Sequence, residues 1–195
     1  GPGYQKSLFA IRGYKFASGA DTLVERPLSL VTSGLSFMSI ACRRDWLLEV
    51  GGFDPALRMY EDLDLLLRLA ARGPWVFTPE IVCRARRIAE PSAFSLTGQA
   101  ALNAARTKLS RVHILERALS REGLGVDEKR HLTSALSGAL FDMARVVEAG
   151  GSARQALVLL VRSARVHPSR LRGTAKAAAL LVLGPRRYDR LLAGR

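Results

Sequence analysis

Residues 43–73 read RRDWLLEVGGFDPALRMYEDLDLLLRLAARG, a stretch in which two helical patterns flank a loop. The first pattern, Arg43–Val50, places Trp46, Leu47 and Val50 on one face and is followed directly by two glycines. Because glycine readily adopts the left-handed conformation of a helix C-terminus, Gly51-Gly52 is expected to end this helix. Phe53-Asp54-Pro55 then begins a loop in which the Asp54 carboxylate can accept backbone N–H groups.

The second pattern, Glu61–Ala71, is the clearest helix in the first half of the chain. Its apolar stripe has helical spacing and ends at Gly73-Pro74. The pair Glu61-Asp62 falls in the first turn, where the helix dipole and the free N–H groups favour carboxylates. Most acidic first turns only cap a helix, so the pair by itself indicates capping more strongly than catalysis.

The segments on either side of this stretch predict strands. Leu28–Cys42 is apolar and rich in β-forming residues, with a break at Ser33-Gly34, which predicts a buried strand, a turn and a second short strand. Trp75–Thr78 and Ile81–Arg84 predict two more strands, separated by Pro79. The first half of the chain is therefore predicted to be a mixed α/β domain.

The second half predicts helices only. Gly1-Pro2-Gly3 is typical of the scar left when a tag is cleaved, so we divide the chain into this scar, a domain over residues 4–95 and a helical region over residues 96–195. Ser152 is a suitable N-cap for the third of the predicted helices. These helices are Leu96–Leu119, Asp127–Ala149, Ala153–Val166 and roughly Arg170–Leu183.

Charge separates the same two halves. Residues 1–83 carry nine Lys/Arg and nine Asp/Glu, whereas residues 84–195 carry twenty-one against eight and supply the whole net charge of +13. A basic region of this kind suits nucleic acid, an anionic membrane surface or phosphate-bearing substrates, and equally a solvated surface.

No apolar run has the roughly 18 residues of a membrane span. Cys42 and Cys83 have no ligand spacing, which favours two reduced, buried thiols in a cytoplasmic protein.

The stretch from Arg43 to Gly73 resembles the characteristic block of family-2-type glycosyltransferases, inverting enzymes with the GT-A fold. In that family an Arg-Arg helix leads into Gly-Gly-Phe-Asp, a short loop, and a Glu-Asp pair that starts a helix with a downstream arginine. A single Glu-Asp pair would be a weak signal, whereas the ordered set is specific. The matching residues here are Gly51, Gly52, Phe53, Asp54, Glu61, Asp62, Arg68 and Gly73.

The resemblance implies an α/β, GT-A-like domain that transfers a sugar from a nucleotide sugar to a hydroxyl acceptor with inversion. The attacking hydroxyl must lose its proton, and by resemblance the base is Asp62, with Glu61 beside it shaping the pocket. Arg68 is expected to form a structural ion pair, and Asp64 to be solvated or to pair with an arginine. The resemblance assigns these residues to the acceptor or donor pocket: Gly51, Gly52, Phe53, Asp54, Tyr60, Ser33 and Gly34.

The chain lacks the donor-side motifs of that family. An Asp-x-Asp metal motif needs two carboxylates near a strand end, whereas Asp62-Leu63-Asp64 lies in a predicted helix that points them apart. We therefore assign no metal ligand in this chain and expect any Mg²⁺ or Mn²⁺ to be held largely by residues outside it. Leu28–Arg87 thus corresponds to the second half of a GT-A domain, and we expect the 195 residues to be inactive alone. Arg84, Arg86 and Arg87 would neutralise a leaving diphosphate or, equally, protect a strand edge.

The expected partners follow from this assignment. They are a nucleotide sugar and a glycan or lipid-linked acceptor, at a cytoplasmic location that includes the inner face of the membrane. Arg186, Arg187 and Arg190 beside the apolar run Ala177–Leu183 suit an interfacial helix and peripheral membrane contact. The alternative function is a non-catalytic basic helical module that binds a membrane surface, a partner chain or nucleic acid. Nucleic acid is disfavoured because the basic region has few aromatic side chains.

Overall fold

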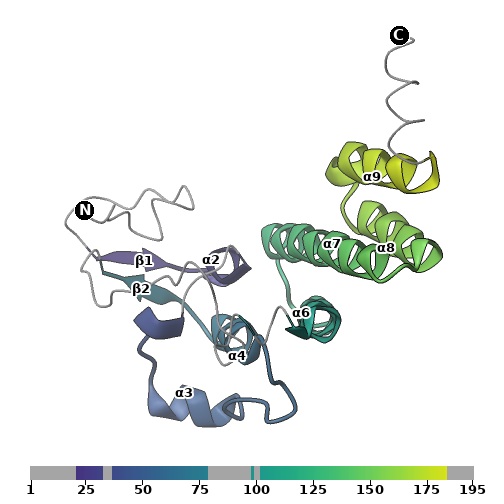
Figure 1. Cartoon of the computed structure of the whole chain (residues 1–195). Helices are drawn as coiled ribbons and strands as arrows, with labels where there is room; N and C mark the ends of the chain where they lie inside the picture. The colour runs from purple at the N-terminus through teal and green to yellow at the C-terminus, as the bar shows by residue number, and fades with distance from the viewer. Residues whose placement is uncertain (1–20, 33–36, 79–97, 99–101, 184–195) are drawn as a thin grey trace, which may run out of the picture. The chain divides into compact units, whose positions relative to one another are not determined.

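The computed structural model describes residues 21–32, 37–78, 98 and 102–183 (Figure 1). The chain divides into two compact units, residues 1–91 and residues 92–195. The described residues are mostly helical and contain one two-stranded sheet, which lies in the first unit. Within this described part, no helix combines the length and the apolar character needed to cross a bilayer.

The described residues of the first unit form three α-helices, a 3-10 helix and a small antiparallel sheet. Its elements are β1 (Thr22–Val24), α2 (Leu28–Thr32), a 3-10 helix η1 (Phe37–Ser39), α3 (Arg44–Glu49), α4 (Glu61–Ala70) and β2 (Trp75–Phe77). Strand β1 pairs with β2, and Leu23 lies opposite Val76. Helix α2 packs against α4, and apolar side chains of both helices form the core. The fully buried members are Leu28, Val31, Leu65, Leu66, Leu67 and Leu69.

The strand–turn–strand prediction for Leu28–Cys42 is wrong. Residues 28–32 form helix α2 and residues 37–39 form η1. The Pro27 carbonyl accepts hydrogen bonds from the N–H groups of Leu30 (2.9 Å) and Val31 (3.2 Å), which closes the first turn of α2. A short apolar run suits a buried helix as well as a buried strand, so its composition did not distinguish the two.

Two further predictions about the first unit are tested by the structure. The strand predicted at Trp75–Thr78 is confirmed as β2, whereas Ile81–Arg84 lies outside the described residues. Cys42 was expected to be buried, and this expectation is wrong because its thiol is exposed just before α3. The apolar residues of this segment enter the core through α2, which leaves residues 41–45 on the surface.

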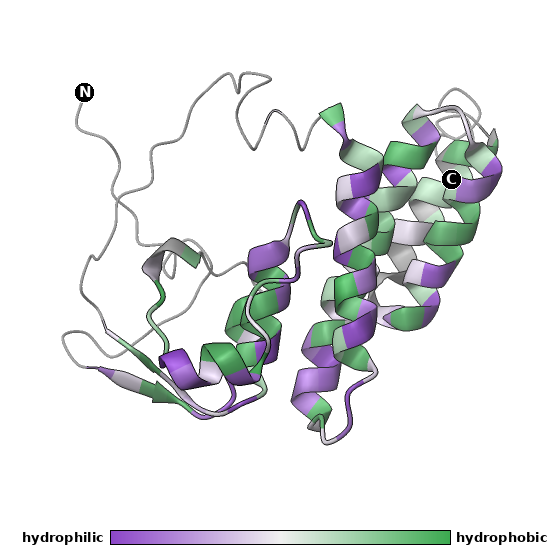
Figure 2. Ribbon diagram, turned by 90° about the horizontal axis from the view of Figure 1, so that it is seen from below, coloured by the Kyte–Doolittle hydropathy of each residue, from purple (hydrophilic) through white to green (hydrophobic). Residues whose placement is uncertain are grey.

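The second unit contains the predicted helices. They are α6 (Ala104–Leu119), α7 (Val126–Ala149), α8 (Ala153–Val166), a 3-10 turn η2 (Pro168–Arg170) and α9 (Leu171–Leu183). Helix α7 packs against both α6 and α8, and α8 packs against α9. Hydropathy colouring distinguishes apolar from polar faces along these helices (Figure 2). The helical prediction is confirmed for the last three helices, although Ser152 makes no side-chain cap at the start of α8. The single helix predicted over Leu96–Leu119 is wrong in its bounds, because Asn103 has a non-helical backbone and α6 begins at Ala104.

Helices α7 and α8 are joined by a buried pair of serines. The Ser137 hydroxyl donates to the Ser163 carbonyl (2.9 Å), and the Ser163 hydroxyl donates to the Ser137 carbonyl (2.8 Å). Both residues are fully buried. Each hydroxyl is therefore satisfied by the opposite helix, which fixes the α7–α8 crossing without leaving a polar group unpaired. This packing determines which face of α8 remains in solvent.

Candidate active site

The acidic pair of the sequence block lies at the start of α4. Glu61 and Asp62 are the first two residues of this helix, and both are half-buried. The Leu63 N–H donates to Oδ1 of Asp62 at 2.7 Å, which orients that carboxylate at the helix N-terminus. Among the described residues, no cationic side chain forms an ion pair with either carboxylate. The free N–H groups and the helix dipole therefore stabilise two charges that no described arginine or lysine neutralises.

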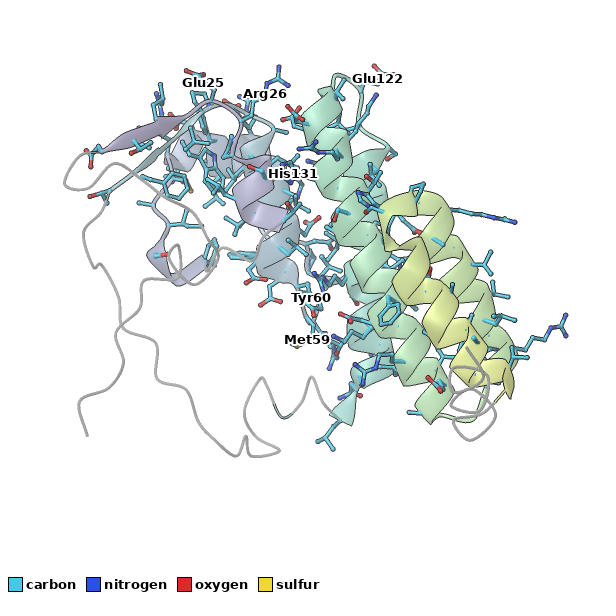
Figure 3. All side chains as sticks on the ribbon, turned by 90° about the horizontal axis from the view of Figure 1, so that it is seen from above. Glu25, Arg26, Met59, Tyr60, Glu122 and His131 are labelled. Atoms are coloured by element: carbon cyan, nitrogen blue, oxygen red, sulfur yellow. The ribbon has the colours of Figure 1, made fainter. Side chains whose placement is uncertain are left out.

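Tyr60, the residue directly before α4, has an unusual backbone conformation. It is the N-cap residue, with φ 63° and ψ 22°, and no other non-glycine residue of the described part has a positive φ. A left-handed conformation costs a residue with a Cβ about 1–2 kcal/mol. Met59 and Tyr60 lie directly before the first turn of α4 (Figure 3). Since such strained residues concentrate at functional sites, the geometry favours a role for this corner beyond helix capping.

Asp64 and Arg68 form a clamp inside the same helix. Arg68 Nε donates to Oδ2 of Asp64 at 2.9 Å, and its NH2 nitrogen lies 2.7 Å from the same oxygen. The Asp64 side chain is 1% exposed and that of Arg68 is 20% exposed. The expected structural ion pair is therefore confirmed, and the alternative of a solvated Asp64 is wrong. An apolar helix face can bury this carboxylate because the guanidinium neutralises it.

Arg68 also holds the end of α3. Its guanidinium donates to the carbonyl of Gly52 at 2.7 Å and to the carbonyl of Val50. The last carbonyls of a helix have no partner within the helix, so these bonds satisfy two acceptors at the α3 terminus. The clamp thereby ties the Gly51-Gly52 turn to α4, the helix that begins with the acidic pair. The sequence predicted the ion pair but gave no indication of these carbonyl acceptors.

The two glycines adopt the backbone conformation that the sequence predicted. Gly51 has φ 82° and Gly52 has φ 63°. The Gly52 N–H donates to the Leu47 carbonyl at 2.9 Å, which closes the C-terminus of α3. A Cβ added at Gly52 would meet no atom within 4 Å, so the demand for glycine comes from the backbone conformation alone.

Replacement of Gly52 by alanine is expected to lower the free energy of unfolding of the first unit by about 1–2 kcal/mol, the cost of a left-handed alanine. Asparagine tolerates this conformation better, so Gly52→Asn should lose less. Urea unfolding followed by tryptophan fluorescence measures both, since Trp46 and Trp75 lie in residues 1–91. Equal losses for the two variants would contradict a purely conformational cause.

The loop after the glycines is ordered by local contacts. The Ala56 N–H donates to Oδ1 of Asp54 at 3.0 Å, and this bond confirms that Asp54 forms the turn. Phe53 packs edge to face on Phe37 of η1, with ring centroids 5.4 Å apart. Its side chain is still 47% exposed. Phe53 thus retains a free surface that a ligand could contact.

Gly73, the last residue of the matching block, has a packing role. A Cβ at this position would lie 3.2 Å from Cη2 of Trp46, closer than most real Cβ contacts. Glu49 and Arg72 form an ion pair between the end of α3 and the residues that follow α4. Trp46 is therefore a structural contact between α3 and Gly73, which agrees with its predicted place on the apolar face of α3.

The remaining predicted site residues lie outside the described part of the chain. They are Ser33 and Gly34, assigned to the pocket, and Arg84, Arg86 and Arg87, assigned to the diphosphate. Their assignments remain predictions.

The described residues do not fit a metal site. No three side chains of His, Cys, Asp or Glu gather within this part of the chain. Asp64 is paired with Arg68, so it cannot act with Asp62 as a metal-binding pair without losing its buried partner.

Comparisons with known proteins leave the family open. No family model, curated protein or solved structure matches the chain.

Proposed function

We propose that residues 4–95 form the acceptor-side half of an inverting glycosyltransferase with a GT-A-like fold, and that Asp62 is its catalytic base. The observation that carries the proposal is the contrast between two carboxylates of one helix. Asp64 is buried and neutralised by Arg68, whereas Asp62, two residues earlier, is half-buried and has no described cationic partner. A proton acceptor must keep its lone pairs accessible to substrate, and Asp62 meets this condition.

The reaction needs little from this part of the protein besides proton transfer and orientation. The acceptor oxygen forms a bond to the anomeric carbon as the bond from that carbon to the diphosphate breaks. The hydroxyl proton moves to Asp62, and the nucleoside diphosphate leaves with the bonding electrons. Tyr60 and Phe53 would contact the acceptor, because Tyr60 adjoins the acidic pair and Phe53 is partly exposed beside the glycine turn. Glu61 would shape the pocket next to the base.

The position of the Asp64–Arg68 clamp also supports the assignment of Asp62 as the base. Arg68 joins the Gly51-Gly52 turn to α4, so the glycine turn is held to the helix that begins with the acidic pair. Catalytic groups need supporting contacts that fix them to within a fraction of an ångström. In the proposed enzyme, Arg68 and Asp64 are therefore positioning residues, and neither contacts substrate.

The stereochemistry of the product tests the reaction type. The complete enzyme, with its nucleotide-binding half present, is incubated with α-linked UDP-, GDP- and dTDP-glucose and with oligosaccharide or lipid-linked glycan acceptors. A one-step displacement should give a β-linked product, which the coupling of the anomeric proton in the NMR spectrum identifies. An α-linked product would contradict a mechanism with a single base.

Calorimetric titration of the 195-residue chain tests the proposal that the nucleotide-binding half of the active site lies outside these residues. We expect no binding of UDP-, GDP- or dTDP-glucose, with or without Mg²⁺ or Mn²⁺, because the sequence contains no donor-phosphate motif. Binding of one donor by the folded chain would show that the nucleotide half is present, while leaving the assignment of Asp62 to be tested by mutation.

A further inference from the structure

Helices α8 and α9 belong to a segment whose charged side chains are all basic. Between Ala153 and Leu183 the sequence contains six Lys/Arg and no Asp or Glu. The other two helices of the second unit carry both signs, with acidic residues such as Glu116 on α6 and Asp142 on α7. An anionic partner would therefore meet no opposing charge of this segment's own.

One face of α8 combines this charge with exposed apolar side chains. Arg154, Val158, Val161 and Arg165 follow the spacing i, i+4, i+7 and i+11, which places them on one side of a helix. All four are exposed, and the valines are 61% and 43% exposed. The opposite side holds Ala156, Leu160 and Ser163, which are buried against the neighbouring helices. We name the exposed set the α8 stripe.

The arginines of the α8 stripe are not neutralised within the described part of the chain. Arg162, one turn away from Val158, forms an ion pair with Glu116 of α6 and lies outside the stripe. Arg154 and Arg165 form no such pair among the described residues. Two uncompensated charges thus flank two exposed valines along one side of a 14-residue helix.

We propose that the α8 stripe docks the protein on a bilayer surface that contains anionic phospholipids. Arginines at both ends would pair with headgroup phosphates, and the two valines between them would enter the apolar boundary below. Proteins that bind single-stranded nucleic acid use aromatic side chains that stack on bases, and the stripe has none. The inference does not depend on sugar transfer, since it concerns a helix that the proposed reaction does not use.

Vesicle sedimentation tests the proposal with the full chain. We expect binding to vesicles of mixed phosphatidylglycerol and phosphatidylcholine, weaker binding in high salt, and little binding to phosphatidylcholine alone. Each arginine near an anionic surface contributes about fivefold to binding, so Arg154→Gln with Arg165→Gln should weaken it by about 25-fold. Val158→Thr with Val161→Thr keeps the side-chain shape, and it should weaken binding less but measurably.

Lys129→Gln with Arg145→Gln is the matched control. It removes the same charge from exposed positions of α7. If binding depends on the α8 stripe, this variant should lose much less vesicle binding than Arg154→Gln with Arg165→Gln. All these positions are exposed, and circular dichroism should show unchanged helix content in every variant. Equal losses in the two pairs, absence of vesicle binding, or tighter binding to a single-stranded oligonucleotide than to the anionic vesicles would each overturn the proposal.

Discussion

In the proposed glycosyltransferase, Asp62→Asn is expected to lower the rate of sugar transfer by about 100- to 10,000-fold, the range that general base catalysis contributes. Asparagine has nearly the same shape, and its carbonyl oxygen can still accept the hydrogen bond that the Leu63 N–H donates to Asp62. It cannot take a proton from the acceptor hydroxyl. The effect should therefore appear in kcat, with little change in KM and a loss of stability of no more than about 1 kcal/mol. Initial rates of nucleoside diphosphate release by the complete enzyme measure it.

Asp127→Asn provides a matched control for this substitution. Asp127 is the second residue of α7, as Asp62 is the second residue of α4, so both variants remove a charge from the same position of a helix dipole. Each should lose about 0.3–1 kcal/mol of helix stabilisation. Only Asp62→Asn should lose activity. A transfer rate close to that of the wild type in Asp62→Asn would exclude this residue as the base.

The sequence predicted those elements whose patterns are long and periodic. Helix α4 and the helices α7 and α8 begin and end within one residue of the predicted bounds, because apolar stripes and glycines mark them clearly. Strand β1 was not predicted. It has only three residues, and its partner β2 lies about fifty positions further along the chain, so no local pattern reveals the pairing.

The candidate site could be predicted in its residue types but not in its contacts. The spacing of Asp64 and Arg68 favours an ion pair within one helix, and this pair is present. The bonds from Arg68 to the carbonyls of Val50 and Gly52 depend on how α3 packs beside α4, which sequence spacing does not encode. The left-handed backbone of Tyr60 was equally hidden, because tyrosine has no preference for that conformation.

Arg68→Leu is expected to have the largest effect on stability, a loss of about 3–5 kcal/mol in the first unit. The substitution leaves the Asp64 carboxylate buried without a cation, and it removes the donor to the carbonyls of Val50 and Gly52. Urea unfolding followed by tryptophan fluorescence reports on this unit selectively, since Trp46 and Trp75 both lie within residues 1–91.

Two further variants separate the causes of that loss. Arg72→Leu removes the arginine of an ion pair whose side chains are 45% and 50% exposed, and an exposed pair of this kind contributes only about 0–1 kcal/mol. Asp64→Leu with Arg68→Leu removes the uncompensated charge and should recover part of the stability. The double variant should remain less stable than the wild type, because the carbonyls at the end of α3 still lack their donor. If Arg68→Leu were no less stable than Arg72→Leu, the clamp would not hold the glycine turn, and the proposed positioning of Asp62 would lose its structural basis.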